Sequence, residues 1–493
     1  MILGDQYQHL HFMGIGGSGI SSAVQFAVAA GRTVSGCDCH LASSAYLSQL
    51  AGVTLWHGHD PAHLDGCDAL VIGPAVRVLD PDNAELRAAE ERGLPIITWQ
   101  ELLAQLMADR CVVSVAGVHG KGTTTSLLAL MLIAAGYDPA CEIGALVPQL
   151  GGNNARLGGG SLFVHEADEF NHNFWHYHPR LAVITSLEFE HPEFFADFET
   201  YLAAFEHFVL GMELCSHWPL PPTLILHGDS AGCRALRERL PAALAVEVVV
   251  VACEGPADYR AVNIRCSDAL TTFTVLKAGH VLGSFASRLP GRHNVENALC
   301  AIAAADRCGV PVAVMREVLA GFGGLRRRFE IRETRAGITL VDDYAHHPTA
   351  VALTIGAARA RFAGRRLIAV YQPHLFSRTK AFLAGYASAF DAADVAGIMD
   401  IFPARERDTG LVHAAVVAEA LRARPAFAHR PAAVRYSGGL AETGAWLRET
   451  ARPGDVVLLM GAGDIAQLTD SLHQELERRQ AEPRATLPAG AVR

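Results

Sequence analysis

The sequence lacks the features that mark secreted, membrane-spanning and nucleic-acid-binding proteins. Its 11 cysteines form no Cys-x-x-Cys pair and no regular framework, which fits a reducing compartment better than secretion. No apolar run approaches the roughly 18 residues of a membrane span, and the N-terminal stretch has no basic segment followed by a long apolar one. We therefore expect a soluble, cytoplasmic protein with no membrane partner.

A basic excess is also missing. The formal net charge is -10, whereas proteins that bind nucleic acid along its phosphate backbone usually carry a positive excess. Nucleic acid is therefore not an expected partner, and any anion must be held by a local site. Half of the 493 residues are hydrophobic, so the chain can bury several cores, and its length suggests about three domains.

Short apolar runs alternate with amphipathic stretches, a rhythm typical of parallel α/β sheets. Changes in this rhythm predict three α/β domains, residues 1–108, 109–325 and 326–477. Residues 478–493 show no periodicity, so we predict a disordered tail. The predicted strands lie in the runs HLHFMGIGG, TVSGCDC, CDALVIG, LPIITW, CVVSVA, LAVITSL, TLILHG, VEVVVVA, ITLVDDY, RLIAVYQPH, VAGIMDIF and DVVLLMGAG.

A first glycine cluster follows the first predicted strand and opens a helical pattern. It spans Gly14, Gly16, Gly17, Ser18 and Gly19, and Asp38 ends the next strand about 20 residues later. Glycines here allow the backbone to approach a diphosphate, and the helix N-terminus favours the negative charge. The plainer alternative is a tight turn between a strand and a helix with no ligand.

A second glycine-rich loop reads VAGVHGKGTTT and lies between an apolar run, Cys111 to Ala116, and a predicted helix. Gly117 and Gly120 precede Lys121, which can neutralise phosphate charge, as in a phosphate-binding loop. A phosphate-binding loop normally continues with Ser or Thr as a Mg²⁺ ligand, but Gly122 stands there. The alternative is a glycine-rich turn with a surface lysine.

Acidic and histidine residues follow two further apolar runs, in the segments VHEADEF and SLEFEHP. Mg²⁺ prefers a few carboxylates together with water and substrate phosphates, so these segments can provide a metal site beside the loop. Taken alone, such a cluster is more often a solvated loop. The residues concerned are Glu166, Asp168, Glu169, Glu188, Glu190 and His191.

These motifs together resemble the ATP-dependent Mur ligases of peptidoglycan synthesis, and the resemblance runs nearly from end to end. HFMGIGGSGISS resembles the family's UDP-sugar loop, and GVHGKGTTTS its phosphate loop GTHGKTTTT. HEADEF and LEFEH resemble its metal segments, GRHNVENALCAI its adenine segment and LRRRFE its interdomain arginine segment. DDYAHHPT, YQPHLFSRT, DIFPARE and GAGDI resemble its C-terminal domain.

The resemblance implies an N-terminal Rossmann-like UDP-binding domain, a central P-loop ATPase-type domain and a C-terminal Rossmann-like domain for the amino acid. It implies a ligase that uses ATP and Mg²⁺ or Mn²⁺ to activate a carboxylate as an acyl phosphate, which an amine then attacks. The branch that it most resembles joins L-alanine to UDP-N-acetylmuramate. The expected partners are these small molecules, and the expected state is a monomer or homodimer.

The resemblance also implies roles for the matching residues. The implied catalytic residues are Lys121, Glu166, His191, Arg328, His346 and His347, with Arg328 directed at the transferring phosphoryl group. ATP would contact Gly117, His119, Gly120, Lys121, Gly122, Thr123, Thr124, His293, Asn294, Asn297 and Arg328. The UDP-sugar would contact Gly14, Gly16, Gly17, Ser18, Gly19 and Asp38. The amino acid would face His346, His347, His374 and Arg378, and the metal ligands would be Thr123, Glu166 and His191.

Three positions depart from the family pattern. Gly122 replaces the threonine after the lysine, Ser186 replaces an asparagine and Glu190 replaces an aspartate. We expect Thr123 to take over the metal contact after a small backbone shift that Gly122 permits.

Two alternatives remain open from the sequence. LEFEHPEFF also resembles the recycling ligase that joins UDP-N-acetylmuramate to an intact murein tripeptide, whereas YQPHLFSRT favours the alanine branch. Gly122 would also suit a non-catalytic sensor that binds the UDP-sugar or ATP. Phosphate release with each amine donor separates the three.

Overall fold

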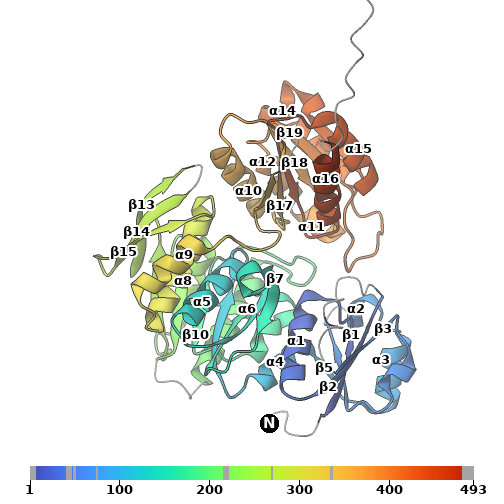
Figure 1. The fold of residues 1–493 in the computed structure, drawn as a ribbon, viewed down its shortest axis with the longest axis vertical. Coiled ribbons are helices and arrows are strands. Elements are labelled where there is room, and N and C mark those ends of the chain that lie inside the picture. The colour runs from blue at the N-terminus through green and yellow to red at the C-terminus, as the bar shows by residue number, and fades with distance from the viewer. Residues whose placement is uncertain are drawn as a thin grey trace, which may run out of the picture. The chain divides into compact units, whose positions relative to one another are not determined.

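The computed structural model describes residues 7–39, 47, 52–73, 76–214, 221–267, 270–333 and 337–479. These residues form three β-sheets flanked by helices (Figure 1). The chain divides into two compact units, one that ends at Arg326 and one that begins at Arg327, and the first unit holds two of the sheets. No helix among the described residues is long and apolar enough to cross a membrane.

The first sheet has five parallel strands in the order β3-β2-β1-β4-β5. Its strands are β1 (His9–Met13), β2 (Thr33–Asp38), β3 (Val53–His57), β4 (Ala69–Ile72) and β5 (Ile96–Thr98). Its helices are α1 (Ser18–Ala29), α2 (Val76–Leu79), α3 (Ala84–Glu91) and α4 (Trp99–Leu106). Strand order reverses beside β1, so the loop after β1 lies at the switch point where ligands bind in such sheets.

The two faces of this sheet follow from the alternation of side chains along β1. Leu10 and Phe12 pack with α1 and α4, whereas Met13 packs with Leu86 of α3 on the opposite face. His11 shares the second face because side chains two residues apart on a strand point the same way. A buried histidine therefore lies on the α3 face of the sheet.

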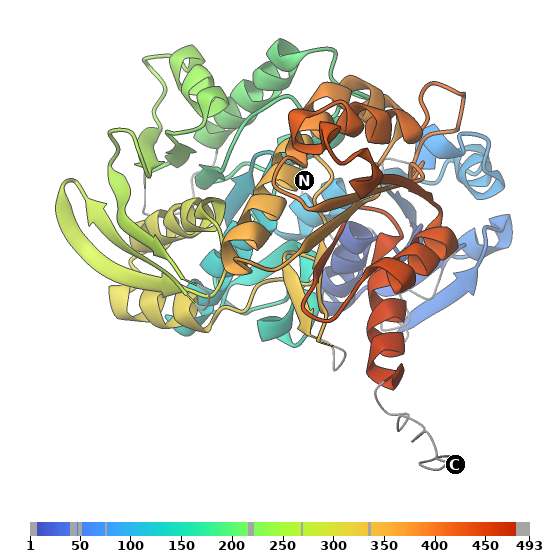
Figure 2. The ribbon, with the colours of Figure 1, turned by 90° about the horizontal axis from the view of Figure 1, so that it is seen from above.

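The second sheet has ten strands in the order β15-β14-β13-β12-β11-β10-β6-β9-β7-β8. Its parallel part contains β6 (Cys111–Ala116), β7 (Ala140–Val147), β9 (Leu162–Glu166), β10 (Leu181–Ile184), β11 (Thr223–His227), β12 (Glu247–Ala252) and β13 (Tyr259–Cys266). Antiparallel pairing adds β8 (Asn153–Arg156), β14 (Thr271–Lys277) and β15 (His280–Ser287). Figure 2 shows β13, β14 and β15 curving together in yellow-green.

Helices cover both faces of the parallel part of this sheet. One face packs against α5 (Lys121–Ala134), α8 (Arg292–Arg307) and α9 (Val312–Gly321), and the other against α6 (Phe198–Leu210) and α7 (Ala231–Arg239). The central strand β6 is buried at every residue. Its run CVVSVA is apolar except for Ser114 and does not alternate with polar residues, which is typical of a parallel strand covered on both faces.

The third sheet belongs to the second unit and has the order β16-β17-β21-β18-β19-β20. Its strands are β16 (Glu330–Glu333), β17 (Thr339–Asp343), β18 (Leu367–Tyr371), β19 (Val395–Met399), β20 (Val434–Gly438) and β21 (Val456–Met460). Only β16 pairs antiparallel among these strands. Its helices are α10 (Pro348–Arg361), α11 (Phe376–Ala381), α12 (Leu383–Ala389), α13 (Ala415–Arg422), α14 (Pro425–Ala428), α15 (Leu440–Thr450) and α16 (Ile465–Arg479).

The α/β class is confirmed, and every strand predicted from an apolar run is present. The prediction of a disordered tail is wrong for its first two residues, because α16 continues to Arg479; residues 480–493 lie outside the described part of the chain. The sequence did not predict β3, β7, β8, β13, β14, β15, β16 or β20.

Candidate active site

The loop between β6 and α5 lies against the end of the neighbouring strand β10. The backbone N–H of Val118 donates to the carbonyl oxygen of Ser186 at 2.9 Å, and that of His119 donates to the Ser186 hydroxyl at 3.1 Å. A Cβ atom on Gly117 would lie 2.5 Å from Oγ1 of Thr185. Gly117 also has a φ of 121°, so only glycine fits this close approach.

Gly120 ends the loop and caps the N-terminus of α5 in a left-handed conformation, with φ of 80°. A Cβ atom there would overlap the side-chain oxygen of Asn297 on α8. The structure therefore brings the glycine loop and the predicted adenine segment together. Backbone N–H groups at the start of α5 have no partner within the helix, which makes this end an anion-binding position.

Lys121, the first residue of α5, is held by two acceptors. Its ammonium group donates to the carbonyl oxygen of Gly117 at 2.6 Å and to Oε2 of Glu169 at 2.8 Å. Burial opposes the charged form, but Glu169, Asp168 and Glu166 together raise the pKa of Lys121. The lysine is therefore positively charged, and two of its three N–H groups have protein acceptors.

Glu169 was predicted to lie in the acidic group beside the loop, but the family resemblance gave it no role. Its side chain is almost fully buried, and Tyr201 of α6 donates a hydrogen bond to it at 3.1 Å. The sequence contained a signal, because Glu169 follows Glu166 in the acidic segment after β9. Its pairing with Lys121, 48 residues away, could not be read from the sequence.

Gly122 faces Glu166 across the first turn of α5. A Cβ atom on Gly122 would lie 3.1 Å from Oε2 of Glu166, which already accepts a hydrogen bond from the Gly144 backbone at 2.9 Å. Gly122 lies inside the first turn of α5 and has no positive φ. Successive side chains on a helix are about 100° apart. The side chain of Thr123 therefore points in a different direction from a Cβ atom on Gly122, which would point at Glu166.

The acidic and histidine residues form a group at the ends of β9 and β10. One potential ligand atom from each of Asp168, Glu169 and His191 lies within 4.8 Å of the others. His191 has a φ of 56°, and its Nδ1 lies 3.0 Å from a carboxylate oxygen of Glu193. The structure therefore groups His191 with Asp168 and Glu169, and Glu166 is not in this group.

Glu142 is an acidic residue near Glu166 that the sequence motifs did not include. It lies on β7 and is buried, and burial together with the negative charge of Glu166 raises its pKa well above the ordinary value. Because β7 was not among the predicted strands, its residue Glu142 could not be placed near Glu166 from the sequence.

The predicted adenine segment forms the first turn of α8. The amide of Asn294 donates to the Pro290 carbonyl at 2.7 Å and lies 3.1 Å from Nε2 of His293. Burial lowers the pKa of His293 to about 4, with the charge of His119 as a lesser cause. His293 is therefore neutral at physiological pH. The hydroxyl of Thr124 donates to the Asn297 carbonyl at 3.3 Å, which fixes α5 against α8.

The glycine cluster of the first sheet forms the turn between β1 and α1. Gly14 has a φ of 75°, and its N–H donates to the carbonyl oxygen of Cys37 at 2.8 Å. The N–H of Gly16 donates to the Asp38 carboxylate at 2.9 Å, so Asp38 holds the loop itself. Gly17 caps α1, which Ser18 begins, and a Cβ atom on Gly19 would overlap the ring of Trp99.

In the second unit, Arg328 lies over the Tyr344 ring, 4.9 Å from guanidinium carbon to ring centroid. The Asp343 carboxylate accepts hydrogen bonds from the Phe329 and Ala345 backbones at 2.8 and 2.7 Å. These bonds join the arginine segment to the loop that carries the predicted histidines. Asp343 was not assigned from the sequence.

The histidines of the second unit lie near one another. The His346 and His374 rings are 5.9 Å apart, and His346 Nδ1 lies 3.1 Å from the Tyr344 carbonyl oxygen. His347 caps α10 and accepts a hydrogen bond from the Thr349 backbone at 3.3 Å. Arg378, on α11, is 2% exposed. His347 thus stabilises the start of α10, and Arg378 is buried in the fold. Their roles at the amino acid stay predictions.

Three family models match the chain in order. They are described as the catalytic domain of the Mur ligase family over residues 9–110, the Mur ligase middle domain over 115–305 and the Mur ligase glutamate ligase domain over 327–463.

Curated relatives match over most of their length. The UDP-N-acetylmuramate–L-alanine ligase of Roseiflexus sp. (strain RS-1) is 39% identical over 92% of this chain and 96% of the relative. The protein of the same name from Myxococcus xanthus is 37% identical over 94% of each chain.

Solved structures share the fold. A UDP-N-acetylmuramate-alanine ligase from Thermotoga maritima matches with a TM-score of 0.78 and 24% identity, over 96% of this chain and 99% of that one. A murein peptide ligase from Psychrobacter arcticus matches with a TM-score of 0.70 and 27% identity, over 95% and 99%.

Proposed function

Because this chain belongs to the Mur ligase family, we propose that it uses ATP to join L-alanine to the carboxylate of UDP-N-acetylmuramate. The strongest support is the similarity to alanine ligases over most of the chain. The charged lysine at a glycine loop agrees with it. The glycine turn after β1 supports a separate position for the UDP-sugar, because it belongs to another sheet than the loop that carries Lys121. A non-catalytic sensor would not need the buried lysine and carboxylates around the first loop.

The proposed reaction has two steps. An oxygen of the substrate carboxylate attacks the γ-phosphorus of ATP, and ADP leaves as the acyl phosphate forms. The amine of L-alanine then attacks the carbonyl carbon, the amide forms, the amine loses a proton, and phosphate leaves with the carboxylate oxygen. Because phosphoryl transfer depends mainly on positioning and charge neutralisation, the cationic loop suits the first step.

Within the first unit, we assign ATP to the loop from Gly117 to Thr124 and to the first turn of α8. Lys121 would donate its remaining N–H to a phosphate while it stays on Glu169. A divalent cation, Mg²⁺ or Mn²⁺, would neutralise phosphate charge, and its oxygen and imidazole ligands would come from Asp168, Glu169 and His191, which lie together. Glu166 stays a proposed ligand on the family resemblance alone. Thr123 stays a proposed ligand.

The remaining assignments follow the same reasoning. The turn from Gly14 to Gly19 would hold the diphosphate of the UDP-sugar, with Asp38 as the residue that shapes it. Arg328, His346, His347, His374 and Arg378 would serve the reaction centre and the amino acid. We propose domain boundaries at residues 108 and 325, with the third domain extending through α16 to Arg479.

The amine donor is tested by phosphate release. With ATP, Mg²⁺ and UDP-N-acetylmuramate present, we expect L-alanine to raise the rate of phosphate release by at least about 100-fold over an intact murein tripeptide, because donor choice is a difference in transition-state binding. Mass spectrometry should identify the alanyl product. Faster turnover with the tripeptide would contradict the alanine assignment, and no turnover with either would indicate a sensor.

The metal position is tested by exchanging hydroxyl groups along the first turn of α5. We expect Gly122→Thr to keep activity and to lower the Mg²⁺ concentration needed for half-maximal rate, because its side chain would face Glu166. Thr123→Ala should raise that concentration if Thr123 is a ligand. Thr125→Ala is the matched control, since its hydroxyl already donates to the Lys121 carbonyl. A Thr123→Ala enzyme with the wild-type Mg²⁺ requirement would remove Thr123 from the metal site.

A further inference from the structure

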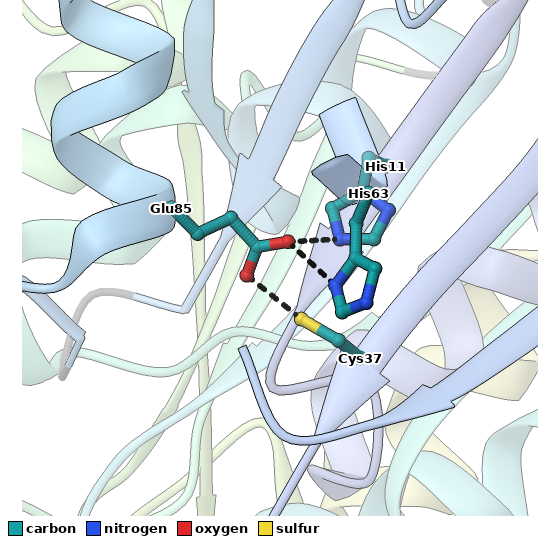
Figure 3. Close-up of side chains that lie close together, drawn as sticks. All are labelled: His11, Cys37, His63 and Glu85. Atoms are coloured by element: carbon teal, nitrogen blue, oxygen red, sulfur yellow. Dashed lines mark hydrogen bonds and ion pairs between the residues drawn. The ribbon is translucent and has the colours of Figure 1, made fainter. Parts of the chain in front are cut away.

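A second group of potential metal ligands lies within the first sheet, apart from the glycine loop that carries Lys121. Four side chains meet on the α3 face: His11 from the middle of β1, Cys37 from the end of β2, His63 from the short 3₁₀ turn Pro61–Leu64, and Glu85 from the first turn of α3 (Figure 3). One ligand atom from each lies within 4.8 Å of the others.

The strand register explains why two of these side chains share a face. In the parallel pair β1 and β2, His11 lies beside Ser35, and Met13 lies beside Cys37. Residues two apart on a strand point to the same side, so His11 and Cys37 both point towards α3. The sheet thus supplies one nitrogen and one sulfur in fixed positions.

The ligand atoms are close enough to share one ion. Glu85 Oε1 lies 2.9 Å from His11 Nε2 and 3.1 Å from His63 Nδ1, and Glu85 Oε2 lies 3.0 Å from Cys37 Sγ. In a tetrahedral zinc site, bond lengths of about 2.0–2.3 Å place neighbouring ligand atoms roughly 3.3–3.6 Å apart. Outward movements of a few tenths of an ångström would therefore convert these contacts into a coordination shell.

Burial and charge favour an ion at this position. The side chains of His11 and Glu85 are 0% exposed, and Cys37 is buried. Among the described residues, the ion-pair partners of Glu85 are three imidazoles, with no Lys or Arg. His11 Nε2 forms an ion pair with Oε1 of Glu85 at 2.9 Å, so a nitrogen and a carboxylate oxygen already lie side by side in this buried group.

The surrounding contacts orient the rings. His11 Nδ1 lies 2.9 Å from the hydroxyl of Ser35, and the His63 ring stacks on Trp56 with centroids 4.6 Å apart. Metal-bound histidines usually have their second nitrogen fixed in this way. His59 offers a further nitrogen, 3.1 Å from Cys37 Sγ, on the more exposed side of the group.

We propose that His11, Cys37, His63 and Glu85 form a structural site for a late first-row divalent cation, with Zn²⁺ as the best match. The mixture of thiolate, imidazole and carboxylate ligands suits Zn²⁺ rather than Mg²⁺ or Ca²⁺. On binding, Cys37 releases its S–H proton to solvent, and the S–Zn bond replaces the S–H bond. The negative charges of the thiolate and the carboxylate then cancel the 2+ charge of the ion. The two imidazoles are neutral, so the buried group as a whole carries no net charge.

The site would brace the neighbouring glycine turn. The carbonyl oxygen of Cys37 accepts hydrogen bonds from Gly14 and Ile15 at 2.8 and 3.2 Å. An ion bound to the Cys37 sulfur would therefore fix the strand end that holds this turn, and would tie the turn Pro61–Leu64 and α3 to the same point.

The test uses the untagged full-length chain, freed of metal by chelation and then titrated with Co²⁺ as a spectroscopic substitute for Zn²⁺. We expect about one tightly bound ion per chain and a thiolate-to-cobalt charge-transfer band in the near ultraviolet. Zn²⁺ should displace Co²⁺ and abolish the band. The group around Lys121 contains no cysteine, so Co²⁺ bound there would give no such band.

Variants show whether these four residues bind a metal ion or form only a hydrogen-bonded cluster. Cys37→Ser should lose the band and at least about 10-fold in Zn²⁺ affinity. Cys67→Ser, a half-buried thiol in the same sheet region, should keep both. Added Zn²⁺ should raise the melting temperature of the wild type and of Cys67→Ser but not of Cys37→Ser. A wild-type protein with no band and no Zn²⁺-dependent stabilisation would overturn the proposal, as would a band that persists in Cys37→Ser.

Discussion

Lys121→Ala is expected to reduce ATP turnover by about 10³-fold or more while binding of UDP-N-acetylmuramate persists. The variant removes the buried ammonium that neutralises developing charge during phosphoryl transfer, where such preorganised groups have their largest effects. The glycine turn proposed for the UDP-sugar belongs to another sheet and does not include Lys121. Steady-state turnover and calorimetric titration with the UDP-sugar measure the two effects separately.

The variant also leaves Glu169 buried without its cation, which can cost about 3–5 kcal/mol of stability. The double variant Lys121→Met with Glu169→Gln removes both charges, so it should recover stability while turnover stays low. Lys277→Ala breaks a more exposed ion pair with Asp306 and should behave as the wild type. Equal loss of ATP turnover and UDP-sugar binding in the double variant would contradict two separate ligand positions.

Gly120→Ala is expected to weaken ATP binding by at least about 100-fold, because the added Cβ atom would displace the loop from the position that favours an anion. Two effects combine at this residue. The backbone is left-handed, which costs alanine roughly 1–2 kcal/mol, and the Cβ atom would overlap Asn297. Equilibrium binding of a fluorescent ATP analogue measures the result.

Gly136→Ala separates these effects. Gly136 follows the same helix α5 and has a φ of 84°, but a Cβ atom there would meet nothing within 4 Å. It should therefore lose stability from the backbone conformation alone and retain ATP affinity. If both variants lost affinity equally, the close approach of Gly120 to Asn297 would not be the reason for the glycine.

The sequence predicted those strands and loops whose residue pattern is complete within one short segment. The run from Cys111 to Ala116 gave β6 at its observed ends, and the glycines that follow gave the loop before α5. Strands with weaker signals were missed. β14 reads TTFTVLK and alternates polar with apolar residues, and it is stabilised by antiparallel pairing with β13 and β15.

The candidate site shows the same division. The sequence identified Lys121 and the acidic segments, but the contact between Lys121 and Glu169 depends on how β6 and β9 pair in the sheet. The sequence led us to expect a small backbone shift permitted by Gly122, whereas α5 begins at Lys121 and contains Gly122 in its first turn. The group around Cys37 combines four separate elements, so no single motif could have revealed it.

ATP is expected to activate the carboxylate of UDP-N-acetylmuramate before L-alanine attacks it. Substrate labelled with ¹⁸O in both carboxylate oxygens should be converted with ATP, Mg²⁺ and L-alanine, and the released phosphate examined by mass spectrometry. We expect each phosphate to carry one ¹⁸O atom, because the oxygen that attacks the γ-phosphorus leaves with phosphate when the amide forms. Alanyl product accompanied by unlabelled phosphate would contradict the acyl phosphate, and labelled ADP or AMP would show that the wrong phosphorus is attacked.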